Sequence, residues 1–319
     1  MGLPLLEVKG LKAYYRTRAG EVKAVDGVSF SVEPKEIFGI AGESGCGKST
    51  LGMALLRLVD PPCYVEAGDV LFDGVDLLEL DAEGLRTIRW KRFSYIPQSS
   101  MNALNPVARI GSQIVDAIAA HEHLSEKEAN KRVAPLLKGV GLAAECADMY
   151  PHELSGGMKQ RAIIAMAMAL GPQLILADEP TTALDVNVQR VVLQALAYLR
   201  EAMGVSVILV THDMAAQAEI ADRLAIMYAG KIVEVGAVDD VFADPLHPYT
   251  QGLMSAIPSL AEKRQIKSIP GYPPNLLDPP PGCRFHPRCP VAVGRCREEQ
   301  PELRSEARGR LVACHLVVE

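Results

Sequence analysis

Long apolar runs are missing from this 319-residue sequence. No stretch approaches the roughly 20 consecutive apolar residues that a helix needs to cross a bilayer. Residues 1–7 (MGLPLLE) also lack the basic region and the long apolar segment of a secretion signal. We therefore expect no membrane span and no export of the chain. The apolar fraction of 49% is nevertheless ample for a sizeable core, so the composition does not indicate disorder.

A basic stripe is missing as well. The chain has 33 Lys and Arg against 39 Asp and Glu, a formal net charge of −6, and the cations are spread along its length. Proteins that bind nucleic acid cluster Lys and Arg against the phosphate backbone. We therefore expect no nucleic acid among the partners. The length, in turn, favours one large domain with an appendage over a single compact core.

The most informative stretch is residues 42–49 (GESGCGKS), here called the phosphate loop, which fits the pattern G-x-x-x-x-G-K-[ST]. The apolar run 37–41 before it predicts a buried strand, and residues 50–56 after it predict a helix. Glycines let backbone N–H groups turn inward around phosphate oxygens, and a helix N-terminus adds partial positive charge there. We expect Lys48 to reach the β- and γ-phosphates of a nucleotide and Ser49 to hold Mg²⁺. The residues expected to contact the nucleotide here are Gly42, Ser44, Gly45, Cys46, Gly47, Lys48, Ser49 and Thr50.

A second glycine motif occupies residues 153–161 (ELSGGMKQR), directly before the small-residue apolar stretch 162–170. That stretch predicts a buried helix with Ser155, Gly156 and Gly157 at its N-terminus, where anions are favoured. Taken alone, the motif would be explained by a helix N-cap. It closely resembles the signature of ATP-binding cassette (ABC) ATPases, in which the signature of one subunit closes over the ATP held by the other. The resemblance implies a head-to-tail dimer with two ATPs at its interface.

Residues 174–180 (LILADEP) resemble the Walker B strand of the same family. Four apolar residues bury the strand and deliver two carboxylates at its C-terminal end. The resemblance implies that Asp178 binds Mg²⁺ through water and that Glu179 polarises the attacking water. Without the phosphate loop, the same residues could equally be a strand that ends in a solvated acidic turn.

Two polar residues that follow apolar segments match further family positions. Gln98 in residues 95–98 (YIPQ) matches the Q-loop glutamine, which contacts Mg²⁺ and the attacking water and links the site to the transport partner. His212 follows the apolar strand 205–211 and matches the switch histidine that contacts the γ-phosphate. A histidine after a strand is unremarkable by itself, so this assignment depends on its place in the series.

The last two matches concern the contact with the partner ATPase subunit and the binding of the adenine ring. Asp185 in residues 183–185 (ALD) matches the D-loop, which crosses to the partner ATPase. Tyr15 stands where the family stacks an aromatic ring on adenine. Its neighbour Tyr14 is the alternative for that position.

The order of the expected elements also fits the family. Strands and helices alternate between residues 174 and 228, which predicts a mainly parallel sheet with helices on both faces. Short strands are expected in residues 5–41 and 68–71. The span of about 99–155 is predicted to be helical and matches the helical subdomain that the family inserts. We therefore expect an α/β fold of the P-loop NTPase type, with an ABC nucleotide-binding domain over residues 1–242.

The chain changes character after this domain. Proline density rises through residues 270–281, which predicts an irregular packed loop or a linker instead of a helix. The segments 244–250 (DPLHPYT), 282–290 (GCRFHPRCP) and 313–316 (ACHL) resemble the C-terminal extension of oligopeptide/dipeptide importer ATPases. We therefore assign residues 243–319 to a small, irregular C-terminal extension of that type.

Four of the seven cysteines lie in this extension: Cys283, Cys289, Cys296 and Cys314. Structural disulfides are disfavoured in a cytosolic chain, and spacings of five and six residues do not fit the usual C-x-x-C zinc knuckle. Four thiolates suit a [4Fe–4S] cluster, and some members of the subfamily are similar in this respect. Zinc and plain buried thiols remain alternatives. In each case we expect a structural role, because a proline-rich tail cannot build its own core.

The resemblance as a whole implies the ATPase subunit of an importer that uses ATP and Mg²⁺. It implies two membrane permease subunits, a second ATPase subunit that is a sister chain or another copy, and an extracytoplasmic substrate-binding protein. The chain would then lie at the cytoplasmic face of the membrane as a peripheral protein. Met158, where most cassette ATPases carry Gln, tends in this subfamily to mark one member of a heterodimer.

The transported substrate stays open within this interpretation. Peptides are the first expectation. However, peptide importers more often carry Asp soon after the Q-loop glutamine, where this chain has Ser99 and Ser100. Oligosaccharides and nickel are therefore alternative substrates with the same mechanism, and a non-transport ABC ATPase is the remote alternative.

Overall fold

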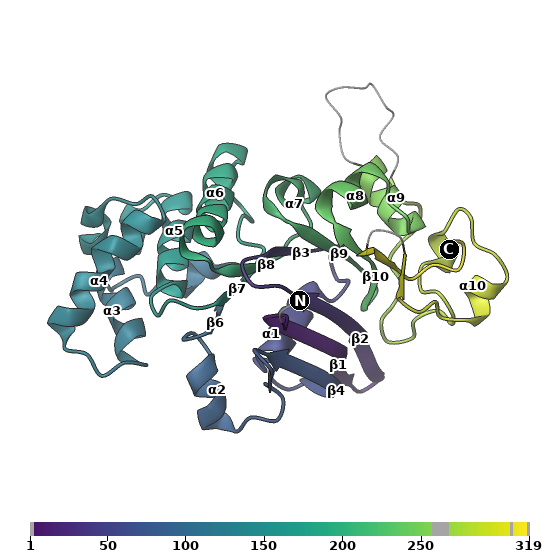
Figure 1. Cartoon of the computed structure of the whole chain (residues 1–319), viewed down its shortest axis with the longest axis horizontal. Helices are drawn as coiled ribbons and strands as arrows, with labels where there is room; N and C mark the ends of the chain where they lie inside the picture. Colours follow the sequence, from purple (N-terminus) through teal and green to yellow (C-terminus); the bar gives the residue numbers. More distant parts are fainter. Residues whose placement is uncertain (1–2, 257–267, 307–308, 318–319) are drawn as a thin grey trace. The chain divides into compact units, whose positions relative to one another are not determined.

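The computed structural model describes residues 3–256, 268–306 and 309–317. It divides into two compact units, and most of their helices and strands are labelled in Figure 1. The first unit comprises Met1–Glu33, Phe38–Glu79 and Val210–Glu319. The second unit comprises Pro34–Ile37 and Leu80–Leu209. The phosphate loop belongs to the first unit, and the Walker B and signature motifs belong to the second.

The first unit begins with an antiparallel sheet of strand order β2-β1-β4-β5. Its strands are β1 (Leu6–Thr17), β2 (Gly20–Val32), β4 (Cys63–Phe72) and β5 (Val75–Asp76). The sequence predicted only short strands here, yet β1 and β2 form a long hairpin. Register shifts between Val8 and Tyr15 explain the difference, because bulges interrupt the alternation of buried and exposed side chains by which a strand is recognised.

A second set of strands in the first unit leads into the phosphate loop. β3 (Ile37–Ala41) runs parallel to β9 (Arg223–Tyr228), which agrees with the mainly parallel sheet that was predicted. Three antiparallel strands continue this set, namely β10 (Lys231–Ala237), β12 (Leu311–Val312) and β11 (Arg304–Ser305). The prediction missed them. Ala229 and Gly230 join β9 to β10 with φ of 48° and 83°, which are the positive values of a tight two-residue hairpin.

Five helices accompany these strands in the described part of the first unit: α1 (Lys48–Leu55), α7 (Met214–Ile220), α8 (Val238–Ala243), α9 (Pro248–Ser255) and α10 (Arg295–Glu298). A 3-10 turn at His286–Arg288 precedes α10. None of the described helices, in either unit, is long and apolar enough to cross a bilayer.

The second unit contains β8 (Ser206–Val210), β7 (Leu174–Asp178) and β6 (Phe93–Ile96), which lie next to one another in that order. Every residue of β7 and β8 is buried, which accounts for their uninterrupted apolar character. The helices of this unit are α2 (Ala82–Ile88), α3 (Ile110–Ala119), α4 (Glu126–Gly139), α5 (Gly156–Ala167) and α6 (Val186–Met203), with 3-10 turns at Ser100–Ala103, Ala144–Asp148 and Pro151–Glu153. The predicted helical span before the signature is confirmed.

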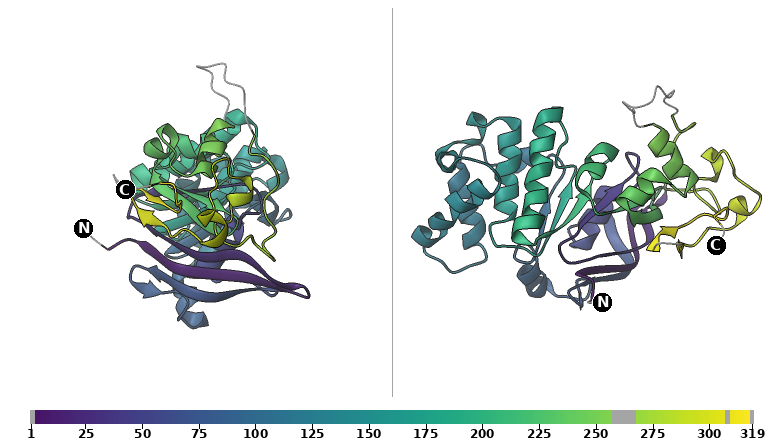
Figure 2. Two further views of the ribbon diagram at one scale, coloured as in Figure 1. Left: turned by 90° about the vertical axis from the view of Figure 1, so that its right-hand side faces the viewer. Right: turned by 45° about the horizontal axis from the view of Figure 1, so that its top comes forward.

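The C-terminal segment is part of the first unit, so both predicted regions, 1–242 and 243–319, contribute to that unit. The rings of Tyr228, Tyr249 and Phe285 meet with centroids 4.5–5.4 Å apart, inside a core that also includes residues of β9 and α8. The strand β12, drawn in yellow, pairs with β10 (Figure 1, Figure 2). The segment therefore buries its aromatic side chains against residues of β9 and α8, as expected of a tail without a core of its own.

Candidate functional site

The phosphate loop connects β3 to α1, so the predicted order of strand, loop and helix is confirmed, with the helix beginning at Lys48. Three glycines have positive φ: 156° at Gly42, 79° at Gly45 and 109° at Gly47. A Cβ atom would lie 2.1 Å from the Met227 oxygen at Gly42 and 1.9 Å from the Ala24 oxygen at Gly47. Side chains are excluded at both positions, so at these two points the loop presents backbone alone near the start of the helix.

The ammonium group of Lys48 lies against the loop itself. Its Nζ donates to the carbonyl oxygens of Gly42 at 2.8 Å and Glu43 at 3.1 Å, and lies 3.7 Å from Cys46 Sγ. Burial raises the pKa of the Cys46 thiol above its usual value, so this side chain is neutral at physiological pH. Gly230 N–H donates to the Cys46 carbonyl oxygen at 2.8 Å, which ties the loop to the β9–β10 turn. The ammonium group of Lys48 is thus in direct contact with the backbone of the loop.

Two adjacent tyrosines of β1 have different surroundings. The hydroxyl oxygens of Tyr15 and Thr50 lie 3.0 Å apart, with Thr50 in the first turn of α1. Tyr14 is buried, and its hydroxyl donates to Asp26 Oδ1 at 2.6 Å. Burial is also the main reason why the pKa of Tyr14 is raised. Of these two tyrosines, Tyr14 is engaged by the core contact, whereas Tyr15 reaches the first turn of the helix that follows the phosphate loop.

The remaining predicted residue of the first unit is His212. Its side chain is exposed, and it stands between β8 and the N-terminus of α7. The next residue, Asp213, caps α7 by accepting hydrogen bonds from the N–H groups of Ala215 at 2.9 Å and Ala216 at 3.3 Å. The helix cap therefore fixes the backbone next to His212.

Two carboxylates stand at the end of β7 in the second unit. Asp178 is fully buried, and the Tyr95 hydroxyl lies 3.4 Å from its Oδ2 as donor. Burial first, and then the Asp178 charge, raises the pKa of Tyr95. Glu179 has φ of 52° and accepts a hydrogen bond at its Oε2 from the Thr182 hydroxyl at 3.0 Å. A left-handed conformation costs a non-glycine residue about 1–2 kcal/mol, and such strain clusters at functional sites.

The signature motif forms the start of α5. Ser155 caps the helix, because its hydroxyl oxygen accepts the Met158 N–H at 3.3 Å. A Cβ atom on Gly157 would lie 2.2 Å from Val188 Cγ1 of α6, so the glycine allows the two helix starts to approach closely. Asp185 in turn caps α6 by accepting the Val188 N–H at 3.0 Å. The signature and the D-loop residue thus lie at neighbouring helix N-termini.

The structure therefore distributes the predicted residues over both units. The first unit contains Tyr15, the phosphate loop with Thr50, and His212. The second contains Gln98, which is exposed in the turn after β6, together with Ser155, Gly156, Gly157, Asp178, Glu179 and Asp185. Tyr95 and Thr182 were missed by the sequence analysis, although Thr182 lies only three residues after Glu179.

The predicted [4Fe–4S] cluster is not supported. Within residues 3–256, 268–306 and 309–317, no group of three or more His, Cys, Asp or Glu side chains is arranged to hold a metal ion. Burial raises the pKa of Cys283 to about 11 and also raises that of Cys289, so both are neutral thiols at physiological pH. Both side chains pack against the aromatic core of the first unit. Of the four cysteines, Cys296 is buried and the other three are partly exposed, whereas the isolated Cys63 and Cys146 are buried as expected.

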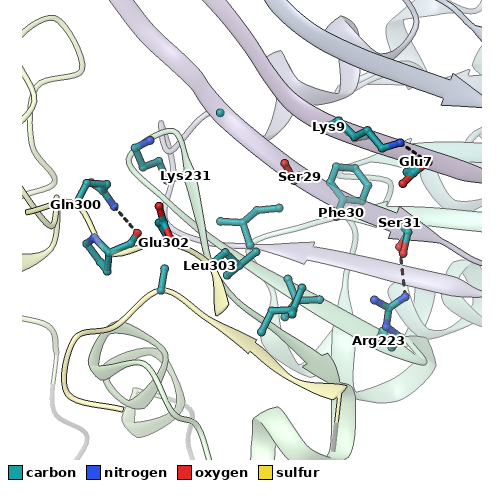
Figure 3. Close-up of a pocket in the computed structure, with 17 residues that line it drawn as sticks. Glu7, Lys9, Ser29, Phe30, Ser31, Arg223, Lys231, Gln300, Glu302 and Leu303 are labelled. Carbon is teal, nitrogen blue, oxygen red and sulfur yellow. Dashed lines mark hydrogen bonds and ion pairs between the residues drawn. The ribbon is translucent and has the colours of Figure 1, made fainter. Parts of the chain in front are cut away.

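A cavity of 580 Å³ lies elsewhere in the first unit (Figure 3). It is lined by residues of β1, β2, β9 and β10 and by the stretch 300–303. Its cations already have partners, since Lys9 pairs with Glu7 at 2.9 Å and Lys231 donates to the Asp26 carbonyl oxygen at 2.8 Å. None of the residues predicted to contact the nucleotide lines it, so we do not assign the nucleotide to this cavity.

Comparisons with known proteins define the class. Residues 25–182 match the family model described as ABC transporter, and residues 233–296 match the model described as oligopeptide/dipeptide transporter, C-terminal region. Among solved structures, the dimeric ATP-binding cassette MJ0796 has a TM-score of 0.65 at 29% identity, over 73% of this chain and 98% of that one. The cassette cbiO1 from Clostridium perfringens has a TM-score of 0.66 at 26% identity, over 76% and 91%. The fold and the motifs are those of an ABC ATPase cassette.

Curated relatives are similar over nearly their whole length. The oligopeptide transport ATP-binding protein OppD of Bacillus subtilis is 42% identical over 94% of this chain and 85% of its own. The dipeptide transport ATP-binding protein DppD of Haemophilus influenzae is 43% identical, over 98% and 96%. A putative peptide import ATP-binding protein of Brucella abortus is 45% identical, over 98% and 94%. This chain belongs to the oligopeptide/dipeptide family of ABC transporter ATP-binding proteins, which confirms the predicted fold class, family and ATPase activity.

Proposed function

We propose that this protein hydrolyses ATP to drive the uptake of oligopeptides or dipeptides through membrane permease subunits. The observation that carries the proposal is a cassette with all its motifs, followed in the same chain by the oligopeptide/dipeptide type of C-terminal region. Relatives named for peptide transport match at 42–45% identity over almost the full chain, which supports the choice of substrate. Permease partners and an ATPase dimer are typical of this family.

The first unit would bind the nucleotide. Backbone N–H groups of the phosphate loop and the N-terminus of α1 face the phosphate oxygens, while the Tyr15 ring stacks on adenine. Lys48 exchanges the carbonyl oxygens of Gly42 and Glu43 for the β- and γ-phosphates. His212 contacts the γ-phosphate. Ser44, Gly45, Cys46, Gly47, Ser49 and Thr50 complete the set of contacts proposed for this unit.

The second unit would supply most of the hydrolytic groups. Its buried Asp178 carboxylate, and the Ser49 hydroxyl of the first unit, are hard oxygen donors of the kind that Mg²⁺ takes. When bound, Mg²⁺ neutralises charge that develops on the transferred phosphoryl group. Glu179, oriented by Thr182, accepts a proton from the attacking water. The water oxygen bonds to the γ-phosphorus while the bond between that phosphorus and the ADP oxygen breaks. Gln98 contacts the ion and the same water.

The signature would act across subunits. Ser155, Gly156 and Gly157 at the start of α5 bind the γ-phosphate of an ATP held by a second ATPase subunit, and Asp185 crosses the same interface. We propose that this head-to-tail dimer drives two permease subunits and receives substrate from an extracytoplasmic binding protein. The chain would then be a peripheral protein at the cytoplasmic face of the membrane.

The test is the ATPase rate of the complete complex, purified with its permeases, as loaded binding protein is added. The proposal expects stimulation by binding protein loaded with peptide and none by unloaded protein. Stimulation only by oligosaccharide-loaded or nickel-loaded protein would keep the mechanism and overturn the substrate. No stimulation by any loaded protein would contradict the role in import.

A further inference from the structure

One residue of the phosphate loop is bound by the C-terminal segment of the chain. The guanidinium of Arg288 donates to both carboxylate oxygens of Glu43, Nη1 to Oε2 at 2.7 Å and Nη2 to Oε1 at 2.9 Å. Its Nε donates to the Pro270 carbonyl oxygen at 2.8 Å, and Nη1 lies 3.3 Å from the Tyr228 hydroxyl. The Arg288 side chain is only 6% exposed. A fork held on three sides in this way fixes the position of the carboxylate.

A second contact reaches the same loop residue from α9. The Glu43 backbone N–H donates to the Tyr249 hydroxyl oxygen at 2.9 Å. Tyr249 is fully buried, and its ring packs against Tyr228 and Phe285. The Glu43 carbonyl oxygen in turn accepts from Lys48 at 3.1 Å. The carboxylate, the N–H and the C=O of Glu43 are therefore each engaged, two of them by residues more than 200 positions later in the sequence.

We propose that Arg288 and Tyr249 are positioning residues that hold the phosphate loop in its nucleotide-binding shape, so that ATP affinity depends on the docked C-terminal segment. The loop needs such support because it contains three glycines, and glycine loses more conformational freedom on ordering than any other residue. Contacts that order the loop beforehand lower the entropic cost of ordering it when ATP binds. The inference rests on the proposed role of residues 42–50 in binding phosphate.

A second arginine of the C-terminal segment, Arg284, allows the positioning of the phosphate loop to be distinguished from simple anchoring of the segment. Arg284 lies four residues before Arg288 and is also buried. It donates to Asp26 and to the Ala229 carbonyl oxygen, both outside the phosphate loop. If Arg288 only fastened the C-terminal segment, then Arg284→Ala and Arg288→Ala would affect nucleotide binding equally.

The experiment measures the dissociation constant of Mg²⁺-ATP by calorimetry on the complete transporter, in a Glu179→Gln background that prevents turnover. We expect Arg288→Ala to weaken binding about tenfold, because a two-bond charged contact to the loop is lost. Arg288→Lys keeps the charge without the fork and should restore only part of the affinity. Tyr249→Phe should weaken binding less than Arg288→Ala, and Arg284→Ala should leave affinity within about twofold. With Glu179 intact, Arg288→Ala should raise KM for ATP and leave kcat nearly unchanged.

The variants also separate the possible failures. Equal affinity in Arg288→Ala and the parent protein, or equal loss in Arg284→Ala, would overturn the inference. If Arg288→Ala does not fold, Glu43→Gln removes the same pair from the other side and should weaken binding in the same direction. Lys48→Ala serves as the control for the loop itself. Unchanged affinity in Lys48→Ala would contradict the proposed phosphate-binding role, whereas a loss there with no effect at Arg288 would contradict only the inference.

Discussion

At the scale of single residues, the sequence predicts those parts of the site that are contiguous. Each of these motifs occupies a short continuous stretch of sequence next to a strand. This is why the phosphate-loop glycines, Lys48 and the pair Asp178–Glu179 are recognisable. The partners that orient these groups are not recognisable in this way. The Arg288–Glu43 ion pair joins residues 245 positions apart, and the Tyr95–Asp178 contact joins residues 83 apart. No local pattern records contacts of that separation, so only the folded chain shows them.

Gly47 gives the sharpest prediction at this scale. In Gly47→Ala, the new Cβ would lie 1.9 Å from the Ala24 oxygen on a backbone with φ of 109°. We expect a loss of about 1–3 kcal/mol from backbone strain alone, a further loss from the clash, and much weaker ATP binding. Chemical denaturation and nucleotide titration measure both effects.

Gly45→Ala is the matched control for this prediction. Its φ is 79°, but nothing lies within 4 Å of the added Cβ. We expect it to cost about 1–2 kcal/mol, the left-handed strain without the clash. If the free energy of unfolding fell equally in the two variants, the requirement for glycine at position 47 would not come from the close approach to Ala24.

At the scale of elements, locally encoded features were predictable and long-range pairing was not. The start of α4 is encoded locally, because Ser125 and Glu128 have the spacing of a capping box. The structure shows the reciprocal capping box, in which Ser125 N–H donates to Glu128 Oε2 at 2.9 Å and Glu128 N–H donates to Ser125 Oγ at 3.3 Å. The strand β12 was missed because it lies more than 70 residues after its partner β10. The strand β10 was missed although it follows β9 across a two-residue turn. The bulged hairpin of β1 and β2 was underestimated because bulges break its alternating pattern.

The capping box supplies a prediction that is separate from catalysis. Ser125→Ala should lower the free energy of unfolding by about 1 kcal/mol, because it removes the side chain that satisfies a helix N–H. Ser112→Ala on α3 is a suitable control, since that exposed hydroxyl donates only to the Arg109 carbonyl oxygen at 2.8 Å. It should change stability by less than about 0.5 kcal/mol. Equal losses in urea denaturation of the two variants would show that the capping box does not stabilise α4.

At the scale of the whole molecule, the C-terminal segment is held by aromatic packing and buried ion pairs. As predicted, this segment shares a core with the rest of the first unit. A metal cluster was the predicted means of attachment, because four cysteines in a chain expected in the cytosol favour metal ligation over disulfides. The structure instead buries Phe285 against Tyr228 and Tyr249, and pairs Arg284 with Asp26. Cysteine spacing alone could not reveal this, because the partners lie in β2, β9 and α9.

His247 makes the attachment of this segment sensitive to acid. The side chain is 1% exposed, and its Nδ1 accepts the Tyr249 N–H at 3.0 Å. Burial lowers its pKa from 6.5 to about 4. The native protein therefore binds fewer protons than the unfolded chain between these values. The contribution of His247 to the free energy of unfolding is fully present above pH 6.5 and is lost as the pH falls towards 4. The total loss is about 3 kcal/mol.

His247→Asn tests this pH dependence, because asparagine does not titrate and its amide oxygen can still accept the Tyr249 N–H. Denaturation at pH 7 and pH 4.5 gives the change in stability for each protein. We expect the fall in stability between these two pH values to be smaller in His247→Asn than in the parent. An identical fall in both would show that His247 is not the buried group that titrates.

The central claim is that hydrolysis at Glu179 of this chain drives peptide import. The most direct measurement is ATP-driven uptake of labelled peptide into vesicles that contain the complete transporter and its binding protein. We expect uptake with the parent chain and at least roughly 100-fold slower uptake with Glu179→Gln, although that variant still binds ATP. Undiminished uptake by Glu179→Gln would contradict the account.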